Sequence, residues 1–309
     1  MSKLLTVFGA TGNQGGSVIR AVLADKALRS EFRIRGVTRD TSKPASKALE
    51  AKGVEMVKAD MSSQQAAAPA VDGAHTVFLV TNFWETMDAA VELAQGKAVA
   101  DASKAAGVQH IIFSSLINTT EASKGRLTHI SHFDGKARIE DYIRGLTGVA
   151  TTAVLPGFFM SNMLTMIRKG DDGAYAWTLP EGVTADKGQV PLFDASEDMG
   201  KFVKAAIKHY PSSAGKRIYA ATDYYTPQRV VDEFASVLGV TARMQNAPQD
   251  VYKSFLPEAI AQEMMENMLL LEDPGYYAGA SLKESLALLG DEKPTAWRDF
   301  VAQNKEKWL

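Results

Sequence analysis

Residues 4–16 read Leu-Leu-Thr-Val-Phe-Gly-Ala-Thr-Gly-Asn-Gln-Gly-Gly, and this stretch decides the fold. A strand-forming run leads into a turn with glycine at every third position, Gly9, Gly12 and Gly15, and a helix-like segment follows over residues 17–26. Glycine permits a tight turn and a close approach of backbone to phosphate, and a helix N-terminus offers free N–H groups to an anion. The order strand, glycine turn, helix therefore predicts a site for a dinucleotide pyrophosphate.

The glycine spacing is G-x-x-G-x-x-G, whereas most dinucleotide-binding dehydrogenases carry G-x-G-x-x-G. An ordinary tight turn is the alternative interpretation. If the turn does bind the cofactor, the residues expected to contact it here are Gly9, Thr11, Gly12, Asn13, Gln14 and Gly15.

The composition excludes several kinds of chemistry. The chain has 309 residues, 46% of them hydrophobic, a net charge of −2 and no cysteine. The absence of cysteine excludes disulfides, zinc–thiolate sites, iron–sulfur clusters and a cysteine nucleophile, and no His/Glu spacing predicts a metal site. The near-neutral charge gives no reason to expect nucleic acid or an anionic membrane as a partner. With no signal peptide or membrane-length apolar run, we expect a cytoplasmic protein, with a nuclear location also open.

Strand-like and helix-like segments alternate through the first half of the chain. The expected strands lie at 4–8, 33–38, 54–58, 75–80, 109–114 and 149–155. The expected helices lie at 14–27, 42–52, 62–71, 84–106 and 131–145. This alternation predicts an α/β fold, a Rossmann-type doubly wound parallel sheet with helices on both faces.

The rhythm changes after Pro156. We expect residues 1–156 to form an NADP-binding Rossmann domain and residues 157–309 a smaller, helix-rich lobe for a substrate or partner. Part of the lobe, 190–225, is expected to return to the sheet, with a seventh strand at 217–221. The stretch 257–271 of this lobe is rich in Met and Leu. We expect it to pack in the core, or else to form a lid on a substrate pocket or a partner-binding face.

Charged residues follow the second and third expected strands. Arg39 ends the second strand, where an NAD-specific dehydrogenase has an acidic residue, and an arginine favours the 2′-phosphate of NADP. Asp40 follows at once and complicates that preference. Asp60 and Met61 end the third strand, where a carboxylate can accept from the adenine amino group and a side chain can pack on the ring. Asp60 is equally well interpreted as a helix cap.

Small polar and aromatic residues follow later strands. Thr81, Asn82 and Phe83 end the fourth strand, and Phe159 and Asn162 come after the sixth. Because the carboxyl ends of parallel strands meet at one edge of the sheet, these residues are candidates for the nicotinamide end of the cofactor site.

His132 and Lys136 are the candidates for catalysis. They lie four residues apart, so on a helix they share one face. A lysine beside a nicotinamide ribose can anchor its hydroxyls, and a histidine can donate the proton that accompanies a hydride transfer. The alternative is an ordinary polar surface at the start of a helix.

With these residues in place, the chain resembles the NmrA-like family of atypical short-chain dehydrogenase/reductases, and most of all its HSCARG-type, NADP-sensing branch. The resemblance covers about the first 200 residues in the right order. The stretches that carry it are Phe8–Gly16, Val37–Arg39, Phe78–Glu85, His132–Lys136 and Val190–Phe193.

This resemblance implies an NADP-binding Rossmann domain in which Arg39 meets the 2′-phosphate and residues 81–83 and Lys136 contact the cofactor. Catalytic short-chain reductases use a Tyr-x-x-x-Lys pair, and His132 stands here in the place of that tyrosine. Related proteins act as cofactor sensors that bind regulatory proteins, whereas others in the wider family catalyse without the tyrosine.

Two functions therefore remain open. The first is a redox sensor in which NADP⁺ or NADPH controls association with a regulatory partner or with a second copy. The second is an NADPH-dependent reductase of the atypical short-chain type, acting on a small quinone, carbonyl or enone. In that case His132, or a tyrosine from the other lobe, would donate the proton.

Overall fold

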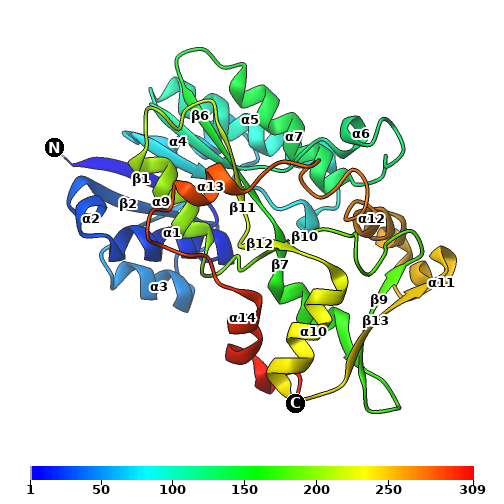
Figure 1. The fold of residues 1–309 in the computed structure, drawn as a ribbon. Helices are drawn as coiled ribbons and strands as arrows, with labels where there is room; N and C mark the ends of the chain where they lie inside the picture. The colour runs from blue at the N-terminus through cyan, green and yellow to red at the C-terminus, as the bar shows by residue number, and fades with distance from the viewer. Residues whose placement is uncertain (1) are drawn as a thin grey trace.

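The first half of the chain builds one large parallel sheet. In the computed structural model, which describes residues 2–309, this sheet has seven strands in the order β11-β6-β5-β4-β1-β2-β3 (Figure 1). The strands are β1 (Lys3–Val7), β2 (Phe32–Thr38), β3 (Glu55–Lys58), β4 (Thr76–Leu79), β5 (His110–Ser114), β6 (Ala150–Pro156) and β11 (Arg217–Ala220). All neighbouring pairs are parallel. The predicted Rossmann-type fold is confirmed, because the chain starts at a central strand and winds outward in both directions.

Helices cover both faces of this sheet (Figure 1). One face packs against α1 (Asn13–Ala24), α2 (Lys26–Glu31), α3 (Pro44–Glu50) and α9 (Met199–Lys208). The other packs against α4 (Gln64–Val71), α5 (Ala89–Ala105) and α7 (Ser131–Arg144). The central strands β4 and β5 are buried along their whole length, as expected for strands covered on both sides.

The C-terminal lobe contains two smaller sheets. The first has the order β12-β10-β7 and consists of β7 (Phe158–Phe159), β10 (Val190–Phe193) and β12 (Asp223–Tyr225). The second has the order β13-β9-β8 and consists of β8 (Ile167–Lys169), β9 (Tyr175–Pro180) and β13 (Ala242–Ala247). Within 190–225, β11 joins the large sheet, whereas β10 and β12 form the separate sheet with β7. The turn at Gly157 brings β7 to β10 so closely that a Cβ there would lie 2.1 Å from the Pro191 carbonyl oxygen.

The remaining helices are short and belong mostly to the lobe. They are η1 (Phe83–Glu85), α6 (Thr119–Ala122), η2 (Met160–Asn162), α8 (Met163–Met166), α10 (Pro227–Leu238), α11 (Gln249–Ser254), α12 (Glu258–Leu269), α13 (Lys283–Ala287), α14 (Trp297–Gln303) and η3 (Lys305–Lys307). Local sequence sets their ends. Thr226 caps α10 through the Arg229 N–H, and Gly239 ends it in the left-handed conformation at φ 68°.

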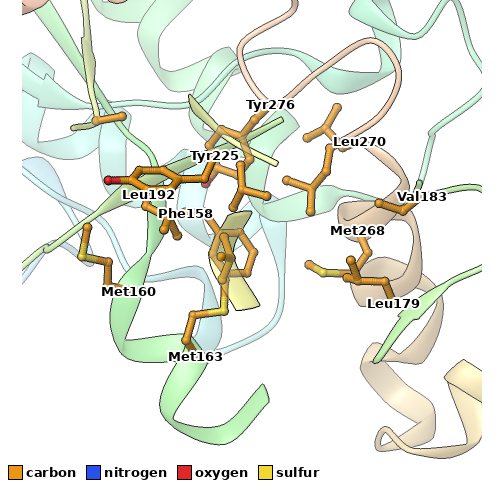
Figure 2. Packing of buried hydrophobic residues seen from close by; sticks show 14 of the residues in the cluster. Phe158, Met160, Met163, Leu179, Val183, Leu192, Tyr225, Met268, Leu270 and Tyr276 are labelled. Carbon is orange, nitrogen blue, oxygen red and sulfur yellow. The ribbon is translucent and has the colours of Figure 1, made fainter. Parts of the chain in front are cut away.

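The lobe packs around an apolar core that also includes Phe133 of α7 and Leu155 of β6. Figure 2 shows Phe158, Leu192 and Tyr225 packed together, with Met268 beside Leu179. The Met- and Leu-rich stretch of α12 serves two purposes. Its residues Met265, Met268, Leu270 and Leu271 are buried in this core, whereas Met264 lines a cavity. The end of α12 therefore anchors the lobe, and one of its faces remains available to a ligand.

Within residues 2–309, no helix combines the length and hydropathy needed to cross a bilayer.

Candidate functional site

Each of the three glycines in the first turn lies in a different structural environment. Gly9 adopts φ 63°, a conformation that favours glycine. A Cβ on Gly15 would lie 2.2 Å from the Gly9 carbonyl oxygen, so this glycine lets α1 pack closely against the turn. A Cβ on Gly12 would meet only that same oxygen, at 3.3 Å, and Gly12 faces solvent. The backbone at Gly12 is therefore open to a ligand.

The N-terminus of α1 fits an anion. Gly12 is its N-cap, and among residues 2–309 no side chain caps its first turn or places a carboxylate there. A twelve-residue helix leaves free N–H groups and a positive dipole end at this point. Thr11 and Asn13 are exposed beside it. The residues present therefore fit the diphosphate of a dinucleotide.

The ends of β2 and β3 lie next along the sheet edge. Arg39 is largely exposed and forms an ion pair with Glu85 of η1. Asp40 accepts hydrogen bonds from Ser42, which lower the pKa of its carboxyl group, so this acid is held in its own turn. Arg39, by contrast, is not held in its own turn and reaches across to η1.

Asp60 has a local role, but it is not the helix cap that one interpretation predicts. Its carboxylate accepts from the Ser62 hydroxyl and N–H, and these bonds hold the pKa of Asp60 below its usual value. Ser63, not Asp60, caps α4. Met61 is partly buried against the core under α4 and α5. Neither residue lines the cavity described next.

A large cavity lies between the carboxyl ends of β4–β6 and the C-terminal lobe. Its volume is about 810 Å³. Eight of the residues predicted from sequence line it: Gln14, Thr81, Asn82, Phe83, His132, Lys136, Phe159 and Asn162. The other eight do not line it: Gly9, Thr11, Gly12, Asn13, Gly15, Arg39, Asp60 and Met61. Gln14 joins the two groups, because it follows the glycine turn and accepts a 2.7 Å hydrogen bond from Ser114 at the end of β5.

Lys136 is held inside the protein by a buried acid. Its Nζ donates to the Thr81 carbonyl oxygen at 2.9 Å, to the Thr81 hydroxyl at 2.8 Å and to Glu92 Oε1 at 2.7 Å. The Thr81 hydroxyl donates in turn to the same carboxylate oxygen of Glu92. Burial lowers the pKa of Lys136, and Glu92 opposes that shift. Lys136 therefore fixes the end of β4, with all three ammonium hydrogens engaged.

His132 forms part of the cavity wall through a contact with the other lobe. Its Nδ1 lies 2.5 Å from Glu263 Oε1 of α12, and its backbone N–H donates to the same oxygen at 2.9 Å. The ring lies against Trp84, with centroids 4.9 Å apart, and near Phe83 at 5.9 Å. The ring nitrogen Nε2 is the one left for a ligand.

The lobe supplies the rest of the wall, and sequence reasoning missed most of it. Tyr252 and Tyr276 line the cavity, and burial raises the pKa of Tyr252 to about 12 and the pKa of Tyr276 further. Apolar and polar side chains complete this wall: Phe158, Phe255, Leu256, Ile260, Met264, Asn267, Arg168 and Arg243. Glu92 and Glu263 were also missed, because nothing in a single helix pattern shows which acid will face a lysine or a histidine.

These features define a class. A doubly wound parallel sheet, a glycine turn before an uncapped helix and a cavity at the carboxyl edge make a Rossmann-type dinucleotide-binding protein. The sequence matches the NmrA-like family over residues 1–301, and the chain belongs to that family. One relative, the NmrA-like family domain-containing oxidoreductase ptmS of Penicillium ochrochloron, is 32% identical over 261 residues, 79% of this chain and 75% of that protein.

Solved structures share the fold. NmrA, a negative transcriptional regulator crystallised with NADP, has a TM-score of 0.79 at 21% identity, over 98% of this chain and 95% of that one. NmrA was also crystallised with NAD. The NADPH-dependent quinone oxidoreductase QOR2 of Escherichia coli, crystallised with NADPH, has a TM-score of 0.75 at 19% identity, over 97% and 99% of the two chains. At these identities the likeness concerns the fold.

Proposed function

We propose that this protein is an NADPH-dependent reductase of the atypical short-chain type, acting on a small, largely apolar quinone, carbonyl or enone. The observation that carries the proposal is the cavity of about 810 Å³, which brings His132 and Lys136 to one wall. Sites for small molecules occupy about 300–1,000 Å³, so this volume suits a substrate beside a nicotinamide. A sensor would need only the part of this space that the nicotinamide fills.

The choice of NADP rests on Arg39. An arginine after β2 can pair with the 2′-phosphate through its planar fork, and the neighbouring Asp40 is engaged by Ser42. The glycine turn and the first turn of α1 would hold the diphosphate. Thr81, Asn82 and Phe83 would meet the nicotinamide ribose and ring, as their places in the cavity wall support.

When bound, the reduced cofactor supplies a hydride. The chain's own residues would do the rest. Aromatic and aliphatic side chains of the lobe exclude water, and His132 presents Nε2 to the cavity as the proton donor. Lys136 keeps the end of β4 in place through Thr81. Tyr276 is a weaker candidate for the acid, because burial raises its pKa and Lys136 is engaged elsewhere.

The test is acceptor-dependent oxidation of NADPH, followed at 340 nm across a panel of quinones, aldehydes and enones. We expect turnover with at least one class, and we expect His132→Gln to lower kcat by about a hundredfold, the scale of general acid catalysis. Binding of NADPH without turnover on any acceptor in the panel would remove the reductase from consideration.

A sensor is the second candidate, and a specific observation favours it. Arg39 and Lys136, two groups expected to meet the cofactor, are instead paired with Glu85 and Glu92. Cofactor binding would have to rearrange these pairs, and η1 with them. A cofactor can shift such an equilibrium only by its different affinity for the two states. The sensor predicts unequal dissociation constants for NADP⁺ and NADPH, and association with a regulatory protein or a second copy that follows the redox state.

A further inference from the structure

Two histidines at the start of α7 are held by two glutamates of α12. His129 and His132 are three residues apart, and so are their partners Glu266 and Glu263. Each carboxylate binds the backbone N–H and the ring Nδ1 of its histidine, at 2.8 and 2.6 Å in the first pair and at 2.9 and 2.5 Å in the second. The two pairs are thus of the same kind, although Glu266 uses both of its carboxylate oxygens and Glu263 uses Oε1 alone.

Their surroundings differ. The side chains of His132 and Glu263 are each only 12% exposed, and the His132 ring lines the large cavity. The His129 side chain is 59% exposed and does not line that cavity, and Glu266 borders a separate, smaller pocket. Two histidine–glutamate contacts of the same kind thus lie in two different places, one at the proposed reaction site and one away from it.

The Glu263 contact fixes the proton arrangement of the His132 ring. A carboxylate at hydrogen-bond distance from Nδ1 requires a hydrogen on that nitrogen, so Nε2 is left to the cavity. The carboxylate also stabilises the ring when both nitrogens carry hydrogen, the form in which Nε2 can donate. A third group that orients a histidine is a recurring arrangement in acid–base catalysis.

We propose that Glu263 is the positioning residue for His132, and that the proton donor of the reduction is complete only when α12 of the lobe lies against α7. This inference rests on the proposed reductase function. When bound, NADPH would supply a hydride to the acceptor carbon, and the C=O π pair would move to oxygen and take the proton that His132 holds on Nε2. His132 is left as the neutral Nδ1–H ring, still bound to Glu263, and a solvent proton restores it. The balance is carbonyl, NADPH and one proton to alcohol and NADP⁺.

The second pair supplies a matched control for the experiment. Glu263→Gln and Glu263→Leu are compared with Glu266→Gln and Glu266→Leu, measuring kcat, the KM of the acceptor and the dissociation constant of NADPH. We expect both Glu263 variants to lower kcat by about tenfold or more, the scale of lost ligand-orienting contacts, with the other two quantities within about twofold. Both Glu266 variants should keep the wild-type kcat.

A spectroscopic readout separates positioning from folding without using turnover. In ¹⁵N-labelled protein, the neutral His132 ring should carry its hydrogen on Nδ1, and Glu263→Leu should abolish that preference while His129 stays unchanged. The inference is overturned if wild-type His132 carries it on Nε2, or if Glu263 and Glu266 variants lose kcat equally. A wild-type protein that binds NADPH but reduces nothing would overturn the reductase itself, and the acid with it, which is a different result.

A separate observation concerns what the acceptor looks like. Asn267 lies one helical turn after Glu263 on α12, is only 4% exposed and lines the cavity. Its Nδ2 finds no hydrogen-bond partner among residues 2–309. Buried amide donors are nearly always paired in native proteins, and a rotation of the Asn267 side chain toward the cavity would let this donor reach a ligand oxygen.

We infer that Asn267 donates to a second oxygen of the acceptor, beyond the one that His132 protonates. His132 and Asn267 both line the cavity, and Glu263, which holds the His132 ring, lies one turn before Asn267 on the same face of α12. Two separate donors in one cavity suit an acceptor with two oxygens. The acceptor class is therefore a conjugated dicarbonyl such as a quinone, in preference to a simple aldehyde or ketone. This inference also rests on the proposed function.

The test compares para-benzoquinone with benzaldehyde on wild type and on Asn267→Leu, so that benzaldehyde, which has a single oxygen, is the matched control. A site built to hydrogen-bond an oxygen discriminates strongly when either partner is missing. We expect Asn267→Leu to raise the KM for the quinone by about tenfold or more, to leave its kcat unchanged and to leave benzaldehyde unaffected. Equal effects on both acceptors, or none on the quinone while wild type reduces it, would overturn the role of Asn267 alone.

Discussion

At the β1–β3 end of the site the backbone forms the binding surface, whereas at the cavity end side chains from distant segments form it. The glycine turn and the first turn of α1 come from one contiguous stretch, 9–16, and need no partner to take shape. The cavity wall instead joins η1, α7, β7, α12 and the loop at Tyr276. The comparison teaches that the diphosphate end of the site follows from one local stretch, whereas the chemistry depends on how the two lobes meet.

The largest expected effect is at the backbone end. Gly15→Ala would place a Cβ 2.2 Å from the Gly9 carbonyl oxygen, so the turn must move away from α1. Losing two phosphate contacts, each worth about 1.5–3 kcal/mol, lowers NADPH affinity about a hundredfold or more. Fluorescence titration with NADPH measures this, and a thermal melt reports the accompanying destabilisation.

Gly12→Ala is the control for that change. Its Cβ meets only the Gly9 oxygen, at 3.3 Å, so the fold should survive with an unchanged melting temperature. The open face at Gly12 would still be obstructed, and affinity should fall by about tenfold. If both variants bound NADPH like wild type, the glycine turn would be a plain turn and the comparison would fail.

Next comes the buried ion pair at the cavity end. Lys136→Met leaves the Glu92 carboxylate buried without its cation, which costs about 3–5 kcal/mol of the free energy of unfolding. The double variant Lys136→Met with Glu92→Gln removes both charges and should recover most of that loss. Urea denaturation of the three proteins gives the values. If Lys136→Met alone were as stable as wild type, the ion pair would not be needed to hold the end of β4 in place.

Acid sensitivity should arise at the opposite end of the same sheet. His110 begins β5, and its Nε2 donates to Thr152 at 2.8 Å, since the Thr152 hydroxyl itself donates to the Ser213 carbonyl. Burial lowers the pKa of His110 from 6.5 to about 4. The unfolded chain therefore binds the extra proton between these values, and stability falls as pH drops from 6.5 to 4, by about 3 kcal/mol at most.

His110→Gln keeps a donor for Thr152 and removes the titration. Its free energy of unfolding should change less with pH across that window than that of the wild type, as measured by urea denaturation at several pH values. NADPH binding should not change, because His110 lies at the amino end of its strand, away from the site. If the free energy of unfolding of the variant changed with pH as it does in wild type, the acid sensitivity would arise from a group other than His110.

The smallest expected effect tests specificity at the backbone end. Arg39→Ala should weaken NADPH binding by about tenfold, the value of one charged hydrogen bond, and leave NADH unchanged. Glu85→Gln releases Arg39 from its exposed ion pair, worth no more than about 1 kcal/mol, and should tighten NADPH binding a few-fold. Titrations of each variant with NADPH and with NADH measure the two dissociation constants. Equal losses for both cofactors in Arg39→Ala would contradict a 2′-phosphate contact.

Much of the fold was readable because its signals are local. The six strands expected before residue 156 correspond to β1–β6, and the signal is clearest at β4 and β5, which are buried along their whole length. β13 was missed, because half of Ala242–Ala247 is polar and the segment becomes a strand only by pairing with β9. Polar residues on an exposed strand carry little pattern of their own.

The same division applies to the site. The cofactor-binding half of the site depends on residues that are close together in the sequence. The sequence by itself determined the glycine turn, the helix that follows it and the arginine after β2. Only the tertiary structure decided that Glu92 faces Lys136, that Glu263 faces His132 across 131 positions, and that Asn267 is left unpaired. The physical reason is that a backbone site follows from local conformation, whereas a side chain acquires its partner only when separate elements pack against one another.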